Sequence, residues 1–184
     1  MKKILFFVFI NICFFTKSHS QEWITYNSSE GKFSVLLPAE PTTQTDSSTT
    51  YPSYITKLFL SKNSIQELFA IGYVDYESSH SFDGQKELEA NRDNFIKGIN
   101  GTLVSTRNTK FNGYQAIEFV AQSSNFYWTS KVFLVGKRPY QLLVGSNTGK
   151  ASEYESKFAC PKVSPNSLFT SPCCISWNGN NSDD

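Results

Sequence analysis

Four runs of strand-forming residues, joined by very short turns, lie between residues 102 and 146 and limit the folds open to this chain. Aromatic and β-branched residues dominate these runs, as they do in β-strands. The pair Asn112-Gly113 separates the first two and is typical of a two-residue hairpin turn. Tight turns join antiparallel neighbours. The region is therefore predicted to be an antiparallel meander of Thr102–Phe111, Tyr114–Gln122, Phe126–Val135 and Tyr140–Ser146, with its last turn at Gly136-Lys137-Arg138-Pro139.

More strands are predicted upstream. Lys32–Pro38 alternates apolar and polar residues and ends at prolines, which cannot donate to a strand ladder. Tyr54–Ser61 and Gln66–Tyr76 flank the turn Lys62-Asn63-Ser64 and form a hairpin signal. Ala39–Ser53 is rich in Ser, Thr and Pro without apolar periodicity, which predicts a surface loop or an extended edge segment.

The apolar period changes to helical spacing in Phe82–Gly101. Asp83 is the expected N-cap and Asn100-Gly101 the expected stop. A second helix pattern covers Lys150–Phe158. One face of the first helix is predicted to carry Leu88, Arg92, Phe95, Ile96 and Ile99, with the arginine stem snorkelling from it.

The resulting order, β-β-β-α-β-β-β-β-α, disfavours a parallel doubly wound sheet because strands and helices do not alternate. We expect an α+β fold in which helices pack on a central antiparallel sheet of about six to seven strands. Residues 21–158 are expected to form this single domain, because they show no internal repeat and no dividing linker.

The first 20 residues have the three regions of a secretory signal peptide. Lys2 and Lys3 precede the apolar run Ile4–Phe15, and Ser18-His19-Ser20 offers a cleavage site. The run is too short to span a bilayer. Cys13 follows Ile12, which does not fit a lipoprotein site. We expect cleavage after Ser20, a secreted or periplasmic protein, and no membrane span after cleavage.

Charge argues against a nucleic-acid partner. The leader holds three of the 17 basic residues and none of the 16 acidic ones, so the remainder has 14 cations and 16 anions. A near-neutral chain without a basic stripe lacks the electrostatic footprint of nucleic-acid binding.

Several motifs in this order resemble the PsbP-like family and its exported bacterial relatives. They are Trp23, Tyr26, Gly31, Phe33-Ser34-Val35, Leu37-Pro38 and Pro41, then Phe111–Glu118 and Val135–Val144. The resemblance covers roughly Trp23 to Phe158. It implies an α/β sandwich, and a non-catalytic accessory or binding module at a membrane surface. No functional residue of the family maps onto this chain.

The search for chemistry assigns no catalytic, cofactor-binding or metal-binding residue. His80 and Asp83 lie three apart, but a metal or acid/base site needs further ligands, so a solvated loop histidine and a helix cap are favoured. Five carboxylates could meet in the fold, and Glu118 is expected to point outward. These carboxylates are Asp75, Glu77, Glu87, Glu89 and Glu118.

In the aromatic run Asn125–Trp128, core packing is favoured over a binding site.

Three functions remain open. The favoured one is an exported non-enzymatic accessory or protein-binding module with an envelope or extracellular protein partner. The alternatives are a carrier of a small apolar ligand between sheet and helix, and a hydrolase using dispersed carboxylates.

The C-terminal residues 159–184 lose both strand and helix periodicity. They hold Cys160, Cys173 and Cys174, an odd number with two adjacent, which does not indicate a clean disulfide framework, although a bond from Cys160 to either of the others stays open. We interpret this segment as an irregular tail, either divergent or produced by a frameshift.

Overall fold

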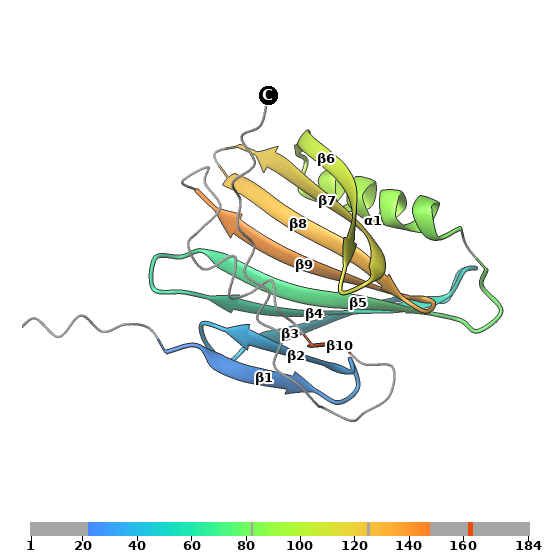
Figure 1. Ribbon diagram of the computed structural model, residues 1–184, viewed down its shortest axis with the longest axis horizontal. Helices are drawn as coiled ribbons and strands as arrows, with labels where there is room; N and C mark the ends of the chain where they lie inside the picture. The colour runs from blue at the N-terminus through green and yellow to red at the C-terminus, as the bar shows by residue number, and fades with distance from the viewer. Residues whose placement is uncertain (1–21, 82, 125, 148–161, 164–184) are drawn as a thin grey trace, which may run out of the picture.

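The computed structural model describes residues 22–81, 83–124, 126–147 and 162–163 (Figure 1). Its strands form two antiparallel sheets. The larger has the order β3-β4-β5-β9-β8-β7-β6, and the smaller has the order β1-β2-β10. The elements are β1 Ile24–Ser28, β2 Phe33–Leu37, β3 Thr42–Ser48, β4 Tyr54–Lys62, β5 Leu68–Tyr76, α1 Gly84–Gly98, β6 Thr102–Phe111, β7 Tyr114–Ser123, β8 Phe126–Val135, β9 Arg138–Ser146 and β10 Lys162–Val163.

The large sheet joins two units that are each consecutive in sequence. β3, β4 and β5 pair in order, and β6 to β9 form the predicted meander. A single antiparallel pairing of β5 with β9, ending at Tyr73 opposite Tyr140, connects the units. The predicted hairpin, the meander and the seven-strand size of the sheet are confirmed.

Helix α1 covers one face of the large sheet, over β7 and β8. We call this the helix face; its buried residues Ile117, Phe119, Ala121, Val132 and Leu134 form one cluster with Leu88 of α1. Phe95, Ile96 and Ile99 pack against the same cluster, which confirms the predicted apolar side of the helix. The side chain of Asp83 accepts hydrogen bonds from the backbone N–H groups of Gln85 and Lys86, so the predicted N-cap is also confirmed.

The opposite face of the large sheet packs against the small sheet, and we call it the small-sheet face. Phe33, Val35 and Leu37 of β2 lie in one buried cluster with residues of β4, β5 and β9. Tyr26 of β1 contacts the ring of Phe59 at a centroid distance of 5.4 Å. Figure 1 shows the small sheet beside the β4 side of the large sheet and α1 near its β6 and β7 side.

The prediction of flanking helices therefore holds only in part. Within the described residues the chain is mainly β, with one helix on one face and a second sheet on the other. The strand Ile24–Ser28 was not predicted, because its alternation is short and three of its five residues, Thr25, Asn27 and Ser28, are polar. It forms because its backbone pairs with β2, from Ile24 opposite Leu37 to Ser28 opposite Phe33.

Two further segments refine the prediction. The polar segment 42–48 is strand β3 at the edge of the large sheet, so the edge-segment interpretation is correct and the loop interpretation is wrong there. The last turn of the meander is also shorter than predicted, since Arg138 and Pro139 already pair with β8. Gly136 has a φ of 65°, which a glycine adopts without strain and which lets the chain reverse in two residues.

The leader 1–20, the predicted helix Lys150–Phe158 and the tail 159–184, including its three cysteines, lie outside the described residues except for β10. β10 pairs with β2 and places a short strand in the predicted irregular tail. No helix in the described part of the chain has the length and apolar character needed to cross a membrane.

Candidate binding pocket

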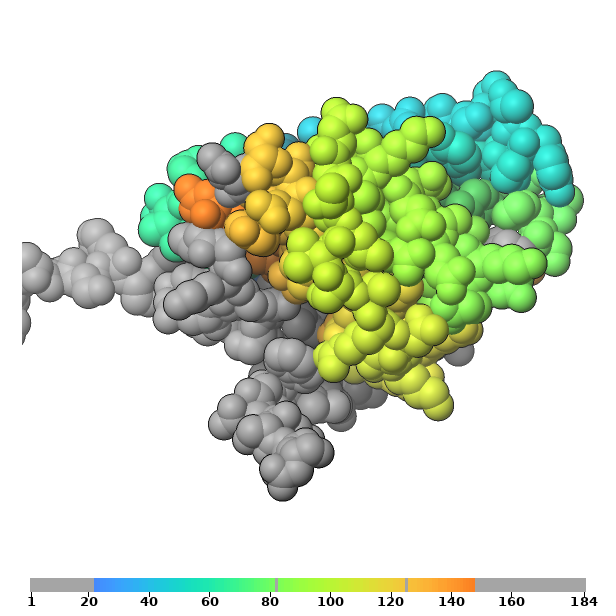
Figure 2. All heavy atoms as spheres, turned by 90° about the horizontal axis from the view of Figure 1, so that it is seen from above, coloured from blue at the N-terminus to red at the C-terminus, as the bar shows by residue number. Residues whose placement is uncertain are grey.

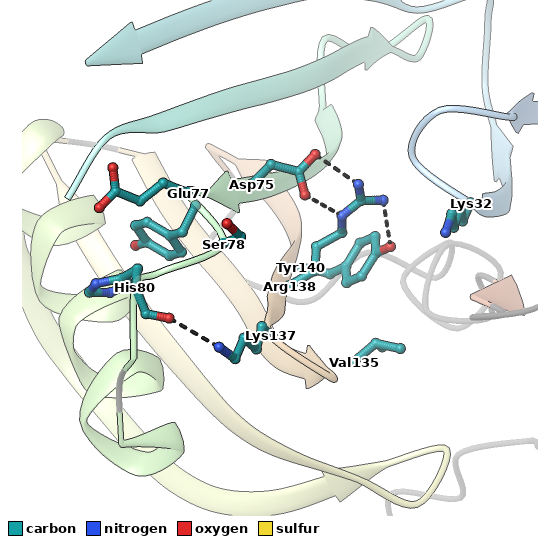
Figure 3. A pocket seen from close by; sticks show the side chains of 10 residues that line it. Lys32, Asp75, Glu77, Ser78, His80, Val135, Lys137, Arg138 and Tyr140 are labelled. Atoms are coloured by element: carbon teal, nitrogen blue, oxygen red, sulfur yellow. Dashed lines mark hydrogen bonds and ion pairs between the residues drawn. The ribbon is translucent and has the colours of Figure 1, made fainter. Parts of the chain in front are cut away.

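A pocket of about 330 Å³ opens where β5 ends and the β8–β9 turn begins (Figure 3). Its volume is at the lower end of the range found for small-molecule sites. Charged and polar side chains dominate its lining. The lining residues are Lys32, Asp75, Tyr76, Glu77, Ser78, His80, Val135, Lys137, Arg138 and Tyr140.

Arg138 is one of the lining residues, and its guanidinium is held within the protein. Its Nε and one terminal nitrogen donate to the two carboxylate oxygens of Asp75 at 2.6 and 2.7 Å, a bidentate pair. The other terminal nitrogen donates to the carbonyl of Glu30 at 3.1 Å and to the hydroxyl of Tyr140 at 3.4 Å. The guanidinium also lies 4.7 Å from the ring centroid of Tyr73. Every nitrogen of Arg138 is therefore engaged within the protein.

The same residues tie the small sheet to the large one. Tyr140 donates its hydroxyl to the carbonyl of Gly31, at 2.9 Å, in the β1–β2 loop. Burial raises the pKa of Tyr140 against the opposing effect of Arg138, so this hydroxyl stays protonated at neutral pH. Burial, with the negative charge of Glu30, raises the pKa of Tyr73 to about 12. Neither tyrosine can serve as a base at neutral pH.

Two lysines of the lining lie on tight turns, on opposite sides of Arg138 and Tyr140 (Figure 3). Lys137 lies in the β8–β9 turn and donates its ammonium to the carbonyl of His80 at 3.3 Å. Lys32 follows the β1–β2 loop with a φ of 52°, a conformation uncommon for a residue with a side chain. Lys32 makes no side-chain hydrogen bond or ion pair within the described residues. Both lysines are exposed.

The second acid of the lining, Glu77, is held on the other side. It accepts hydrogen bonds from the hydroxyls of Ser53, at 2.7 Å, and Ser79, at 3.0 Å. These bonds, that of Ser53 first, keep the pKa of Glu77 below its usual value. Figure 3 shows its carboxylate at the opposite end of the lining from Lys32.

His80 and Asp83 do not form a pair that could do chemistry. Asp83 caps α1 and is absent from the pocket lining, whereas His80 lines the pocket. The His80 ring lies 4.7 Å from the ring of Tyr76, and it is half-buried rather than solvated as expected. The part of the chain that the structure describes holds no group of three or more His, Cys, Asp or Glu side chains that could bind a metal ion.

The remaining candidate carboxylates lie elsewhere. Glu118 is on the small-sheet face, between Arg107 at 2.5 Å and Lys131 at 2.7 Å. Alternation correctly placed Glu118 on the opposite face from Ile117 and Phe119. The side chain is only 19% exposed, however, and does not point freely into solvent as expected. Glu87 is buried and accepts a hydrogen bond from the hydroxyl of Tyr76. The fold thus brings only Asp75 and Glu77 of the five to the pocket.

The aromatic run of β8 packs as predicted. Phe126 and Trp128 share the helix face, with ring centroids 4.7 Å apart, and Trp128 meets Phe95 of α1 edge-on at 5.7 Å. Trp128 thus occupies part of the space between sheet and helix, where an apolar ligand was considered. The described pocket is instead lined mainly by charged and polar residues and lies at the end of the sheet.

The pocket was not predicted, since Arg138 was assigned to a turn and Lys32 to the start of a strand. The signal that could have found it is the acid–base pair Asp75 and Arg138 at the ends of two strands, but only the β5–β9 register aligns them. The described arrangement can hold a ligand electrostatically. Its two carboxylates are engaged within the protein, Asp75 with Arg138 and Glu77 with two serines.

No family model matches the sequence, and no curated protein is similar to it. Among solved structures, the fold is similar to the solution structure of PsbP (CyanoP) from the cyanobacterium Synechocystis sp. PCC 6803. The TM-score is 0.44 at 9% identity, over 71% of this chain and 83% of the cyanobacterial protein. This is the family whose motifs the sequence resembles, and the likeness concerns the fold.

Proposed function

We propose that this chain is an exported, non-enzymatic accessory module that binds a protein partner in the cell envelope or outside the cell. The observation that carries the proposal is strand β6, an exposed edge of the large sheet. All residues from Thr102 to Asn108 are exposed. Its outer side has no neighbouring strand in the described sheet. Such an edge presents backbone donors and acceptors that an extended segment of another protein can pair with.

The side chains of β6 indicate the chemistry of the partner segment. Leu103 and Val104 are 42% and 55% exposed, which supplies apolar contact at one end of the strand. Arg107 and Lys110 are its charged residues, and it contains no acid. An extended segment with apolar residues at one end and acidic residues at the other is complementary to this edge. Figure 2 views the molecule from above, with β6 and α1 facing the viewer.

The non-enzymatic part of the proposal is supported by the state of the pocket acids. A hydrolase based on two carboxylates needs one acid with a raised pKa to donate a proton. Glu77 has a lowered pKa, and Asp75 holds a guanidinium with both oxygens. Neither is arranged for that role.

The binding proposal is tested by capture from the native envelope fraction with the processed protein as bait. Val104→Lys adds a charge to the β6 edge and should abolish capture of any specific partner. Thr45→Lys on the other exposed edge, β3, is the matched control and should capture it normally. Capture that is equal with both variants would exclude β6 as the docking edge, and no capture by the unaltered protein would overturn the proposed function.

The exported address is tested separately by fractionating the producing cells. The protein should be found outside the cytoplasm, and its N-terminal residue should be Gln21. A cytoplasmic protein that retains Met1 would contradict the signal-peptide prediction.

A further inference from the structure

We infer that Arg107 is the specificity-determining residue of the β6 edge and that it selects a partner strand with an acidic residue opposite it. This role rests on the proposed function, in which an extended segment of another protein pairs with β6. It fixes one position of that segment and the face of the sheet on which its side chain lies.

A row of charged side chains crosses three strands on the small-sheet face and ends at this edge. Lys131 of β8 lies opposite Glu118 of β7, and Glu118 lies opposite Arg107 of β6. The ammonium of Lys131 is 2.7 Å and a terminal nitrogen of Arg107 is 2.5 Å from the Glu118 carboxylate. The row thus alternates in sign, holds two cations and one anion, and has a cation at its outer end.

Exposure increases along the row toward the edge. The side chains of Lys131 and Glu118 are each 19% exposed, whereas that of Arg107 is 56% exposed. Opposite charges directly across neighbouring strands stabilise a sheet, and like charges in the same places destabilise it. A strand added beside β6 therefore continues the alternation if it carries an acid opposite Arg107. A basic residue at that position would face an exposed cation instead.

The backbone of β6 brings such an acid close to Arg107. Phe111 and Tyr114 flank the two-residue turn Asn112-Gly113, so they are expected to form a hydrogen-bonded pair of the β6–β7 ladder. Bonded and non-bonded pairs alternate, so Arg107, four residues before Phe111, also directs its backbone toward β7. The residues that direct backbone donors and acceptors toward the open side are Thr106, Asn108 and Lys110.

An added strand that uses these outward groups meets Arg107 in a non-bonded pair. All pairings in the described large sheet are antiparallel. In a non-bonded antiparallel pair the two Cα atoms are only about 4.5 Å apart and the side chains lie closer than in a bonded pair. The register shift between Leu103 and Ser105 interrupts the regular ladder at one end. The regular part of the docking edge is therefore Ser105–Phe111, which contains Arg107.

Lys110, the other cation of β6, does not belong to this row. It lies opposite Gln115, and an odd number of positions separates it from Arg107, so its side chain is on the helix face. Lys110 therefore provides a matched control. It carries the same charge on the same strand but faces the other side of a docked segment.

The test is a titration of the 15N-labelled protein with heptapeptides of sequence Thr-Val-Thr-X-Thr-Val-Thr at millimolar concentration, with Glu, Gln or Lys as X. The sequence is palindromic, so both strand directions place the same residue types beside β6. Binding is followed by the amide shifts of Thr106, Asn108 and Lys110. We expect the Glu peptide to bind about fivefold more tightly than the Lys peptide, with the Gln peptide between them, the scale of one exposed charge pair made or opposed.

Variants assign this preference to Arg107. Arg107→Gln should abolish it, and Arg107→Glu should reverse it in favour of the Lys peptide. Lys110→Gln should keep the preference of the unaltered protein. Thermal unfolding establishes that each variant is folded. Because Arg107→Glu places two acids opposite each other, Arg107→Gln decides the question if the charge-reversed variant does not fold.

Two results would overturn the role of Arg107 and leave docking at the β6 edge standing. One is equal binding of all three peptides to the unaltered protein, and the other is an unchanged preference in folded Arg107→Gln. A third result, in which no peptide shifts the β6 amides, would overturn docking at this edge together with the role of Arg107.

Discussion

Asp75 and Arg138 lie opposite each other at the ends of β5 and β9, and the carboxylate holds the guanidinium with two hydrogen bonds of 2.6 and 2.7 Å. The pair sits two residues beyond the last backbone pairing of these strands, Tyr73 opposite Tyr140. The side chains thus continue the link between the two halves of the large sheet where the backbone ladder stops. Arg138 extends it to the small sheet through the Glu30 carbonyl.

Replacing Arg138 by glutamine should lower the free energy of unfolding by about 2 kcal/mol, the scale of one hydrogen bond to a charged group. The loss is smaller than for a fully buried pair, because the Asp75 side chain is 40% exposed and water screens it. Urea denaturation measures the change. Asp75→Asn in the same chain should restore part of the loss, and an unchanged urea midpoint for Arg138→Gln would contradict the structural role.

Glu118 should make the stability of the folded protein depend on pH. Partial burial favours the neutral acid, but the hydrogen bonds and charges of Lys131 and Arg107 outweigh it and hold the pKa of Glu118 below its usual 4.5. A carboxylate with a lowered pKa in the folded state stabilises the fold above the unfolded pKa, and this stabilisation is lost as the pH falls through the folded value. Glu118→Gln should therefore cost about 1 kcal/mol at neutral pH and progressively less below about pH 4.5. Urea unfolding of both proteins across this range measures the difference, and a cost that stays constant with pH would contradict it.

The N-cap of α1 is tested by Asp83→Ala. The Asp83 carboxylate accepts from the N–H groups of Gln85 at 2.9 Å and Lys86 at 3.1 Å. Its loss should reduce stability by about 1 kcal/mol. Asp83→Asn keeps an acceptor at the same place and should be nearly neutral in thermal unfolding. Equal effects of both substitutions would show that charge, and not capping, is what matters at this position.

Gly145 of β9 lies under the aromatic pair of β8. A β-carbon added there would meet Trp128 Cζ3 at 2.6 Å, so the ring that packs against Phe95 would have to move. Gly145→Ala should cost about 1–3 kcal/mol, as overpacking does, and should change the fluorescence of Trp128. Gly98→Ala in α1 is the control, because nothing lies within 4 Å of the added carbon and alanine favours a helix. Similar stabilities of the two variants would contradict the packing described.

Local signals predicted most of the strands. Alternation in Lys32–Pro38 predicted a strand, now observed as β2, and the Asn112-Gly113 pair marked the hairpin between β6 and β7. β3 could not be identified as a strand because Thr42–Ser48 contains no apolar residue, and its conformation follows from pairing with β4. Pro139 was wrongly assigned to the turn before β9, because proline is disfavoured in a central strand. It is tolerated because it lies outside the β5–β9 ladder and faces only Leu134 of β8.

The candidate pocket depends on distances along the chain that no local pattern contains. Asp75 and Arg138 are 63 residues apart, and Lys32 joins them only because the small sheet docks over β5 and β9. The charge cluster around Glu118 likewise requires the registers that set Arg107 and Lys131 opposite it. Residue types suggested the participants, and only the strand register assembled them.

The single pairing of β5 with β9 also sets the order in which the chain can fold. The hairpins of each half close loops of a few residues and can form quickly, whereas β5 must wait for β9, which follows α1 and three further strands. The β1–β2 hairpin must also wait, because the carbonyl of Glu30 accepts a hydrogen bond from Arg138, 108 positions later in the chain. The first hairpin to be synthesised is thus among the last to find its place, and until then its apolar side, with Phe33, Val35 and Leu37, has no sheet to lie against.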